Sequence, residues 1–164
     1  MPAPSPFPAL SATSAALRLR TAAPVELIDI TPRLQDFVRR SRLGTGWLNV
    51  QVLHTTASLA INEDEPLLRS DLLRLLERLA PSAAPYAHDE LHRRRDIEPG
   101  ERPNGHAHAK ALLLRTSETL NVVGGALQLG RWQRVFLMEM DGPRERELSL
   151  VALGDGLDSG VGTR

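Results

Sequence analysis

The chain reads WLNVQVLH from Trp47 to His54, and this stretch carries a strong strand signal. Its apolar side chains suit the core of a sheet, and His54 stands at its end. A short polar run follows, and residues 59–61 predict a second short strand. The fold prediction therefore starts from a sheet, with a histidine placed where a strand ends.

The residues before this strand predict two more strands and a helix. Apolar and polar side chains alternate over residues 17–21 and again over 25–30, and we expect these two half-buried strands to pair as a hairpin. Thr31 is expected to cap a helix, with Pro32 at its first position. The glycines within residues 44–46 are expected to end that helix.

The residues after the strand predict two further helices and several more strands. The helices are expected over 66–79 and 107–114, the second capped by Asn104. The strands are expected over 119–123, 126–129, 131–141 and 144–153. Strands outnumber helices and hairpins dominate. The predicted class is therefore α+β, with largely antiparallel sheets and two to three helices.

The composition fits one domain that binds neither nucleic acid nor a membrane. We expect a single domain over 14–154, a disordered lead-in over 1–13 and a flexible tail over 155–164. The 20 basic and 20 acidic residues cancel, whereas proteins that bind nucleic acids or membrane surfaces usually carry a basic excess. No apolar run approaches the roughly 18 residues of a membrane span. The N-terminus lacks the pattern of a signal peptide, so we expect a cytoplasmic protein.

Histidines are the main candidates for chemistry, because the chain has no cysteine. The stretch NGHAHAK over 104–110 holds His106 and His108. On a strand both imidazoles would face one side, whereas on a helix they lie about 200° apart and one alone can face a site. The helix-forming composition after Asn104 favours the second interpretation. From spacing alone, a three-histidine metal site stays an alternative to histidines that are solvated or bonded to the backbone.

Two groups of charged residues are further candidates. The Glu-Asp-Glu run of residues 63–65, with Asp71 in the following helix, could supply a general base or bind a cation, or could be a solvated turn favoured by the helix dipole. The arginines of residues 93–95 lie in a long charged segment over 86–103 and could clamp a phosphate. The sequence contains no nucleophile elbow, P-loop or dinucleotide-binding fingerprint.

A set of short motifs along nearly the whole chain resembles the YjbQ family. The matching segments are His54 to Ser58, Ile61 to Glu63, Tyr86 to His88, Asn104 to His108 with Leu112-Leu113, Leu129 to Gln133, and Asp141 to Arg144. Each motif is weak alone, but together and in this order they are specific. The resemblance implies a compact α+β fold assembled as a homotrimer.

The resemblance also implies a site made by three histidines near a subunit boundary. The family's motifs place the ligands of a divalent metal ion, zinc or magnesium, or of an anion, at His54, His88 and His108. The catalytic candidates that match family positions near the site are Glu63, Asp71 and Asn62. The chain departs from the family pattern at Arg115 and Arg131, which add bulk and charge to their loops.

The activity implied by the resemblance is that of a thiamine-phosphate synthase, a transferase. Such an enzyme joins hydroxymethylpyrimidine diphosphate to a thiazole phosphate and releases pyrophosphate, which requires neutralisation of the leaving diphosphate. One alternative is a metal-dependent hydrolase of a phosphorylated small molecule, and another is a non-enzymatic trimeric protein that binds a metal or ligand. In a further alternative, the histidines are structural residues of a subunit interface.

Overall fold

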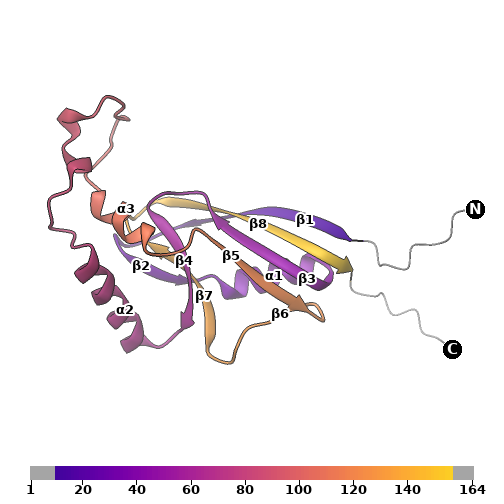
Figure 1. Cartoon of the computed structure of the whole chain (residues 1–164). Coiled ribbons are helices and arrows are strands. Elements are labelled where there is room, and N and C mark those ends of the chain that lie inside the picture. Colours follow the sequence, from indigo (N-terminus) through magenta and orange to yellow (C-terminus); the bar gives the residue numbers. More distant parts are fainter. Residues whose placement is uncertain (1–9, 157–164) are drawn as a thin grey trace, which may run out of the picture.

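The computed structural model describes residues 10–156, which fold into two antiparallel sheets and three α-helices (Figure 1). The larger sheet has the order β1-β8-β3-β5-β6, with bounds Ser11–Arg20, Glu145–Gly156, Leu43–Val52, Ser117–Val123 and Ala126–Leu127. The smaller sheet has the order β2-β7-β4, with bounds Glu26–Asp29, Gln133–Glu139 and Ala57–Glu63. The helices are α1 (Thr31–Ser41), α2 (Pro66–Leu79) and α3 (Gly105–Leu112). The predicted α+β class is confirmed.

The main core lies between the inner face of the larger sheet and a layer made by α1 and the smaller sheet. Side chains of β8 alternate strictly, so that Leu148, Leu150 and Ala152 are buried while their neighbours are more exposed. They pack with Leu34 of α1 and Leu137 of β7 in one continuous cluster. The larger sheet therefore has one buried face and one open face.

Strand β7 is buried on both faces and joins this core to a second one. Leu137 faces the main core, whereas Phe136 and Met138 pack against α2 and α3 with Leu76 and Ala107. Two buried faces explain why the sequence of β7 is a continuous apolar run and not an alternating one. Glu139 is the exception at the end of this run, since it is charged and fully buried.

The predicted hairpin between the first two strands is wrong. Strand β1 pairs with β8, and β2 pairs with β7, so the two strands lie in different sheets. Alternation identifies a half-buried strand, but it does not identify the partner, which is decided by packing between residues distant in sequence. The predicted lead-in also overlaps β1, which begins at Ser11; residues 1–9 and 157–164, including most of the predicted tail, lie outside the described residues.

The first helix begins as predicted but with a different capping arrangement. Thr31 is its first helical residue, and Asp29 Oδ1 accepts a hydrogen bond from Thr31 N at 2.8 Å. The Thr31 hydroxyl instead accepts from Val135 N at 2.8 Å and ties α1 to β7. The helix ends at Ser41, and the glycines expected to end it lie inside β3.

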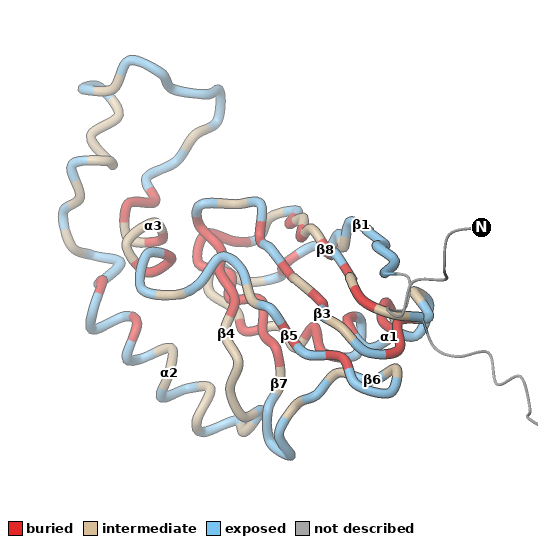
Figure 2. Tube along the Cα trace, turned by 45° about the vertical axis from the view of Figure 1, so that its right-hand side comes forward, coloured by how far each residue is buried: buried red, intermediate tan, exposed pale blue. Residues whose placement is uncertain are grey.

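A protruding arm connects α2 to α3 and consists mainly of exposed residues (Figures 1 and 2). It contains two short 3₁₀ turns, η1 (Ala87–Asp89) and η2 (Leu91–Arg93). This is the charged segment that the sequence marks as too long and polar for a simple connection. No helix among the described residues is both long and apolar enough to cross a membrane.

A buried lysine fixes α3 to the end of α2. Lys110 is 1% exposed, and its Nζ donates to Glu77 Oε2 at 2.7 Å and to Ser82 Oγ at 2.9 Å. A buried ammonium group requires such partners, because it has left its hydration shell. The contact sets the position of the helix that carries His108.

This contact predicts a loss of stability in acid. Hydrogen bonds from Lys110, and then from the Ser82 backbone, lower the pKa of Glu77 from 4.5 to about 2. Since the folded pKa lies below the unfolded one, the contribution is complete above about pH 4.5 and is lost as the pH falls toward 2. Urea denaturation should show the free energy of unfolding falling across this window, and falling less in Glu77→Gln. Lys110→Met should remove the same portion of the pH dependence, and wild-type profiles in both variants would contradict the assignment.

Candidate functional site

The principal pocket lies where the arm meets the body of the domain, and its volume is about 530 Å³. Its walls come from the β3–β4 connection, the arm, the start of α3 and the segment that leads into β8. The three histidines expected from the sequence, His54, His88 and His108, all line it. Segments far apart in the chain therefore bring these side chains to one cavity.

A glycine at the start of α3 allows the arm to approach closely. A Cβ on Gly105 would lie 2.5 Å from the Cβ of Tyr86, which is closer than real side chains come. The Gly105 backbone N–H also donates to Asp89 Oδ1 at 2.7 Å. These contacts seat η1 against α3 and place His88 beside His108.

His88 and His108 form an edge-to-face pair, with ring centroids 4.8 Å apart. Burial lowers the pKa of His108, and the nearby His88 lowers it further. His108 is therefore neutral at pH 7 and has a lone pair to offer. His106 lies on the same helix but outside the pocket, where its ring centroid is 6.5 Å from that of Tyr86. The prediction that His106 and His108 diverge on a helix is confirmed.

His54 is held by the backbone of β8. The Glu147 backbone N–H donates to His54 Nε2 at 2.8 Å, so Nε2 carries no proton and the neutral ring bears its proton on Nδ1. Burial lowers the pKa of His54, and the positive charge of Arg146 lowers it further. His54 therefore presents a hydrogen-bond donor at Nδ1, while its Nε2 lone pair is already used.

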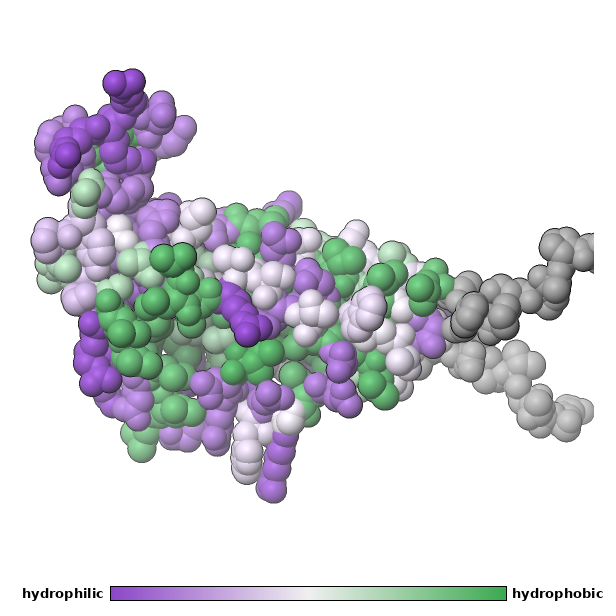
Figure 3. Space-filling view, in the orientation of Figure 1, coloured by the Kyte–Doolittle hydropathy of each residue, from purple (hydrophilic) through white to green (hydrophobic). Residues whose placement is uncertain are grey.

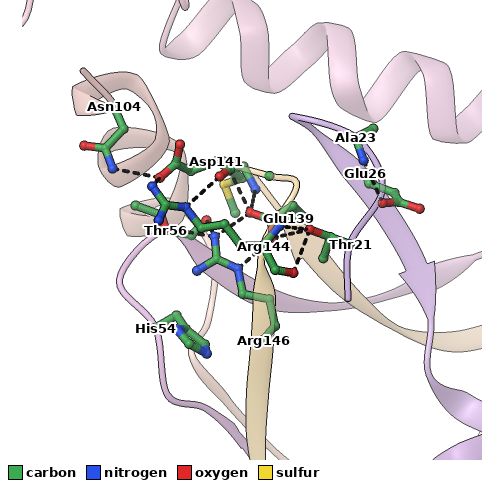
Figure 4. Close-up of polar contacts among 12 residues, drawn as sticks. Thr21, Ala23, Glu26, His54, Thr56, Asn104, Glu139, Asp141, Arg144 and Arg146 are labelled. Carbon is green, nitrogen blue, oxygen red and sulfur yellow. Dashed lines mark hydrogen bonds and ion pairs between the residues drawn. The ribbon is translucent and has the colours of Figure 1, made fainter. Parts of the chain in front are cut away.

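A buried ion pair lies beside His54 and forms the floor of the pocket through Arg146 (Figure 4). Arg146 binds Glu139 through two atoms, Nε to Oε2 at 2.6 Å and Nη2 to Oε1 at 2.5 Å, and Nη2 also donates to Thr56 Oγ1 at 3.0 Å. Burial disfavours the Glu139 carboxylate, but Arg146 and the Asp141 backbone N–H outweigh burial and hold its pKa below the usual value. The Thr21 hydroxyl donates to the same carboxylate at 3.0 Å.

A second buried carboxylate, Asp141, joins the arm to the turn before β8. Arg102 Nε donates to its Oδ1 at 3.0 Å, Arg144 Nη2 to its Oδ2 at 2.7 Å, and Asn104 Nδ2 to its Oδ2 at 2.8 Å. Burial opposes ionisation of Asp141, but Asn104 and the two arginines overcome it and lower its pKa. Asn104 was predicted to cap α3, yet its side chain makes no capping bond and is used here instead.

The charges around the pocket balance when the histidines are neutral. Three arginines line it, and so do three carboxylates. The arginines are Arg94, Arg144 and Arg146, and the carboxylates are Glu98, Glu101 and Asp141. Arg94 is the one member of the predicted 93–95 clamp in this lining, and it pairs with Glu101.

The predicted catalytic residues lie elsewhere in the chain. Asn62 and Glu63 lie at the end of β4, and Asp71 lies on the exposed side of α2 in a pair with Arg74. None of the three lines the histidine pocket. Their catalytic role stays a prediction, and their position in the structure lends it no support. Glu65, in the same acidic run, caps α2 by accepting from Leu67 N and Leu68 N at 2.9 and 2.7 Å.

No group of three or more histidine, aspartate or glutamate side chains within residues 10–156 is arranged closely enough to hold one metal ion. The three-histidine metal site therefore stays a prediction, with two of its members in contact and the third held by Glu147 N–H. Arg115 and Arg131, where the chain departs from the family pattern, lie outside this pocket.

Sequence reasoning missed the paired charges beside the histidines. Glu139 did carry a signal, because it is the one charged residue in the apolar run from Val135 to Met140. Arg144 and Arg146, two residues apart at the start of the last strand, carried a second signal, because alternate residues of a strand share a face. Their carboxylate partners, Asp141 and Glu139, come next to them only when the two sheets pack together.

The fold and this pocket define an α+β protein with a histidine- and arginine-lined cavity beneath a protruding arm, and comparison with known proteins identifies the class. A family model described as UPF0047 protein YjbQ-like matches residues 15–155. The chain belongs to this YjbQ family. A UPF0047 protein of Archaeoglobus fulgidus is 42% identical over 84% of this chain and 98% of its own length. A UPF0047 protein of Methanothermobacter thermautotrophicus is 38% identical over 84% of this chain and 90% of its own length.

Solved structures agree with this assignment. A YbjQ-like protein of unknown function from Sulfolobus solfataricus superposes with a TM-score of 0.80 at 30% identity, over 90% of this chain and 100% of its own. An uncharacterised conserved protein of the YjbQ/UPF0047 family from Clostridium acetobutylicum gives a TM-score of 0.73 at 33% identity, over 85% and 99% of the two chains.

The prediction of a thiamine-phosphate synthase activity has to be corrected. The relatives are described as UPF0047 proteins, and the solved neighbours as uncharacterised or of unknown function. The synthase and transferase assignments therefore have no support from the proteins that this chain resembles.

The buried pair beside His54 predicts a large stability effect. Glu139→Ala leaves the Arg146 guanidinium buried without its carboxylate, which should cost about 3–5 kcal/mol in the free energy of unfolding. The matched control is Glu145→Ala, which removes the partner of Arg20 in an exposed pair and should cost about 0–1 kcal/mol. Chemical denaturation measures both, and equal losses would show that burial does not govern the Glu139 contact.

Proposed function

We propose that His88 and His108 hold a divalent metal ion such as zinc, and that the pocket uses it to bind a small phosphate-bearing molecule. The observation that supports this proposal is the pair of adjacent imidazoles in an open cavity, one of them kept neutral by burial. Neutral imidazole nitrogen is a common ligand for zinc and related ions. The donor set therefore fits a metal ion.

The charge balance of the pocket supports an anionic ligand once an ion is present. Without a metal ion, the lining arginines and carboxylates cancel. A bound divalent ion would add positive charge and attract a phosphate group, in the way that metal ions stabilise phosphoryl oxygens. The protein's own residues position the ligand: Arg144 and Arg146 are fixed by carboxylates, and the arm covers one side.

The metal proposal predicts selective loss of zinc binding. Metal-free protein is titrated with Zn²⁺ by calorimetry, and His88→Ala and His108→Ala should each weaken Zn²⁺ binding at least about tenfold, since even the loss of supporting residues of metal sites costs about 10–100-fold. His92→Ala, an exposed histidine of the arm, is the matched control and should bind as the wild type does.

His54→Ala distinguishes the proposed two-histidine metal site from a three-histidine site. In our proposal metal affinity stays within about threefold of wild type, because the His54 Nε2 lone pair of the wild-type protein accepts from Glu147 N–H and does not bind the metal ion, whereas a three-histidine site predicts a loss equal to that of His108→Ala. Absence of stoichiometric Zn²⁺ binding in the wild type contradicts both versions.

We also propose that the chain forms a homotrimer, as membership of the family implies. In Figure 3 apolar side chains gather on the face that carries α3 and the adjoining β4. Leu112 and Leu113, after the buried part of α3, are 86% and 52% exposed, as is typical of residues that meet another subunit.

Light scattering should give three times the mass of one chain. Leu112→Glu should shift the protein toward smaller species, because it places a charge in the apolar patch. Glu118→Gln, nearby on β5, is the control that should leave the mass unchanged. A monomeric wild type contradicts the trimer.

A further inference from the structure

The buried guanidinium of Arg146 keeps one nitrogen free. Its Nε and Nη2 are occupied by Glu139 and Thr56, whereas Nη1 has no hydrogen-bond partner among the described residues. Among the same residues, Asn104 Oδ1 is the one fully buried side-chain atom without a hydrogen-bond partner. Nη1, which also lacks a partner, is therefore not fully buried. Arg146 itself is 4% exposed and lines the pocket, so Nη1 is the part of the side chain that reaches the cavity.

His54 supplies a second fixed donor beside it. Figure 4 shows the His54 ring on the side of the Arg146 guanidinium opposite Glu139, and both residues line the pocket. The bond from Glu147 N–H to Nε2 forces the proton onto Nδ1, and it also fixes the orientation of the ring. The Nδ1–H group forms no hydrogen bond with any residue that the structure describes.

We propose that Arg146 Nη1 and His54 Nδ1–H together form an oxyanion seat, distinct from the His88–His108 pair, that binds oxygen atoms of the ligand's anionic group. The inference rests on the proposed function for placing a small anionic ligand in this pocket, but its two donors act without a metal ion. It assigns to His54 the role of a hydrogen-bond donor to the ligand, in place of the predicted role of a metal ligand.

The seat is rigid, and its local charge is small. Glu139 holds the guanidinium in place and cancels its charge, while Asp141 does the same for the neighbouring Arg144. Binding therefore depends on two preoriented donors and not on a net positive field. Glu147 adds one further negative charge near His54, so an oxyanion of low charge is the class that the seat accepts best.

The test uses full-length protein stripped of metal with a chelator and titrated at pH 7.5. Inorganic phosphate and acetate are titrated separately, because the two donors accept oxygen from either group, and binding is followed by NMR chemical shifts. Wild-type protein should bind at least one of the two saturably. Failure to bind either overturns the seat, and it leaves the metal site of the proposed function standing.

Two substitutions at His54 distinguish its donor role at Nδ1 from its contact with the Glu147 backbone N–H. His54→Gln keeps an acceptor near Glu147 N–H but lacks a donor at the Nδ1 position, and should weaken oxyanion binding about tenfold or more. His54→Asn keeps an amide donor near the Nδ1 position and should bind within about threefold of wild type. Weak binding in His54→Asn with wild-type binding in His54→Gln overturns the donor role, because the Glu147 contact would then be what matters. Equal weakening in both variants also overturns it, because the amide donor kept in His54→Asn would then not support binding.

Arg146→Lys tests the other half of the seat. Lysine can still pair with Glu139, but it lacks the third nitrogen, so oxyanion binding should fall about tenfold while circular dichroism shows a folded protein. The control Arg131→Lys lies outside the pocket, where its guanidinium stacks on Trp132, and should not change binding. Unchanged binding in Arg146→Lys overturns the seat.

The same titrations on His88→Ala and His108→Ala distinguish this inference from the metal proposal. Both variants should keep metal-free oxyanion binding, even where they lose Zn²⁺. Loss of oxyanion binding in these two variants, with His54→Gln unaffected, would place the anion on the histidine pair and overturn the seat. Binding of acetate without phosphate would support the seat and contradict the phosphate-bearing ligand of the proposed function.

Discussion

The buried pair between Glu139 and Arg146 is the interaction on which the rest of the site depends. Glu139 ends β7 in the smaller sheet, and Arg146 lies at the start of β8 in the larger one, so their two-atom contact joins the sheets where the pocket opens. Neither charge is stable there alone, because each has lost its water. The pair therefore forms when the two sheets pack in one register, and it fixes the floor of the pocket in that register.

Above this floor, the three histidines have three different physical environments. His54 is oriented by a backbone N–H of the last strand, and its ring nitrogens consequently have fixed roles. His108 is positioned by a helix that a buried lysine anchors, and His88 by an arm that can approach because residue 105 is glycine. Residue type alone suggested one set of equivalent ligands, whereas the surroundings divide the set into an imidazole pair and a separate donor.

Much of the secondary structure could be predicted from local patterns. The helix over 66–79 was located with its bounds, and the strands β3, β5 and β8 were found within a few residues. Amphipathic periodicity and turn residues are properties of neighbouring side chains, so a sequence displays them directly. The pairing of strands was harder to predict from the sequence. The expected hairpin of the first two strands was wrong because β1 and β2 pair with strands more than a hundred residues away.

The sequence by itself determined the family, the fold class and which histidine of α3 faces the pocket. It did so because motifs, composition and the 3.6-residue period of a helix are local. The tertiary structure alone decided the pairing of Glu139 with Arg146, the tautomer of His54, the unused nitrogen of Arg146, and the separation of Glu63 and Asp71 from the pocket. These features depend on which distant groups become neighbours and on which of them lose water, and both are set when the sheets and the arm pack together.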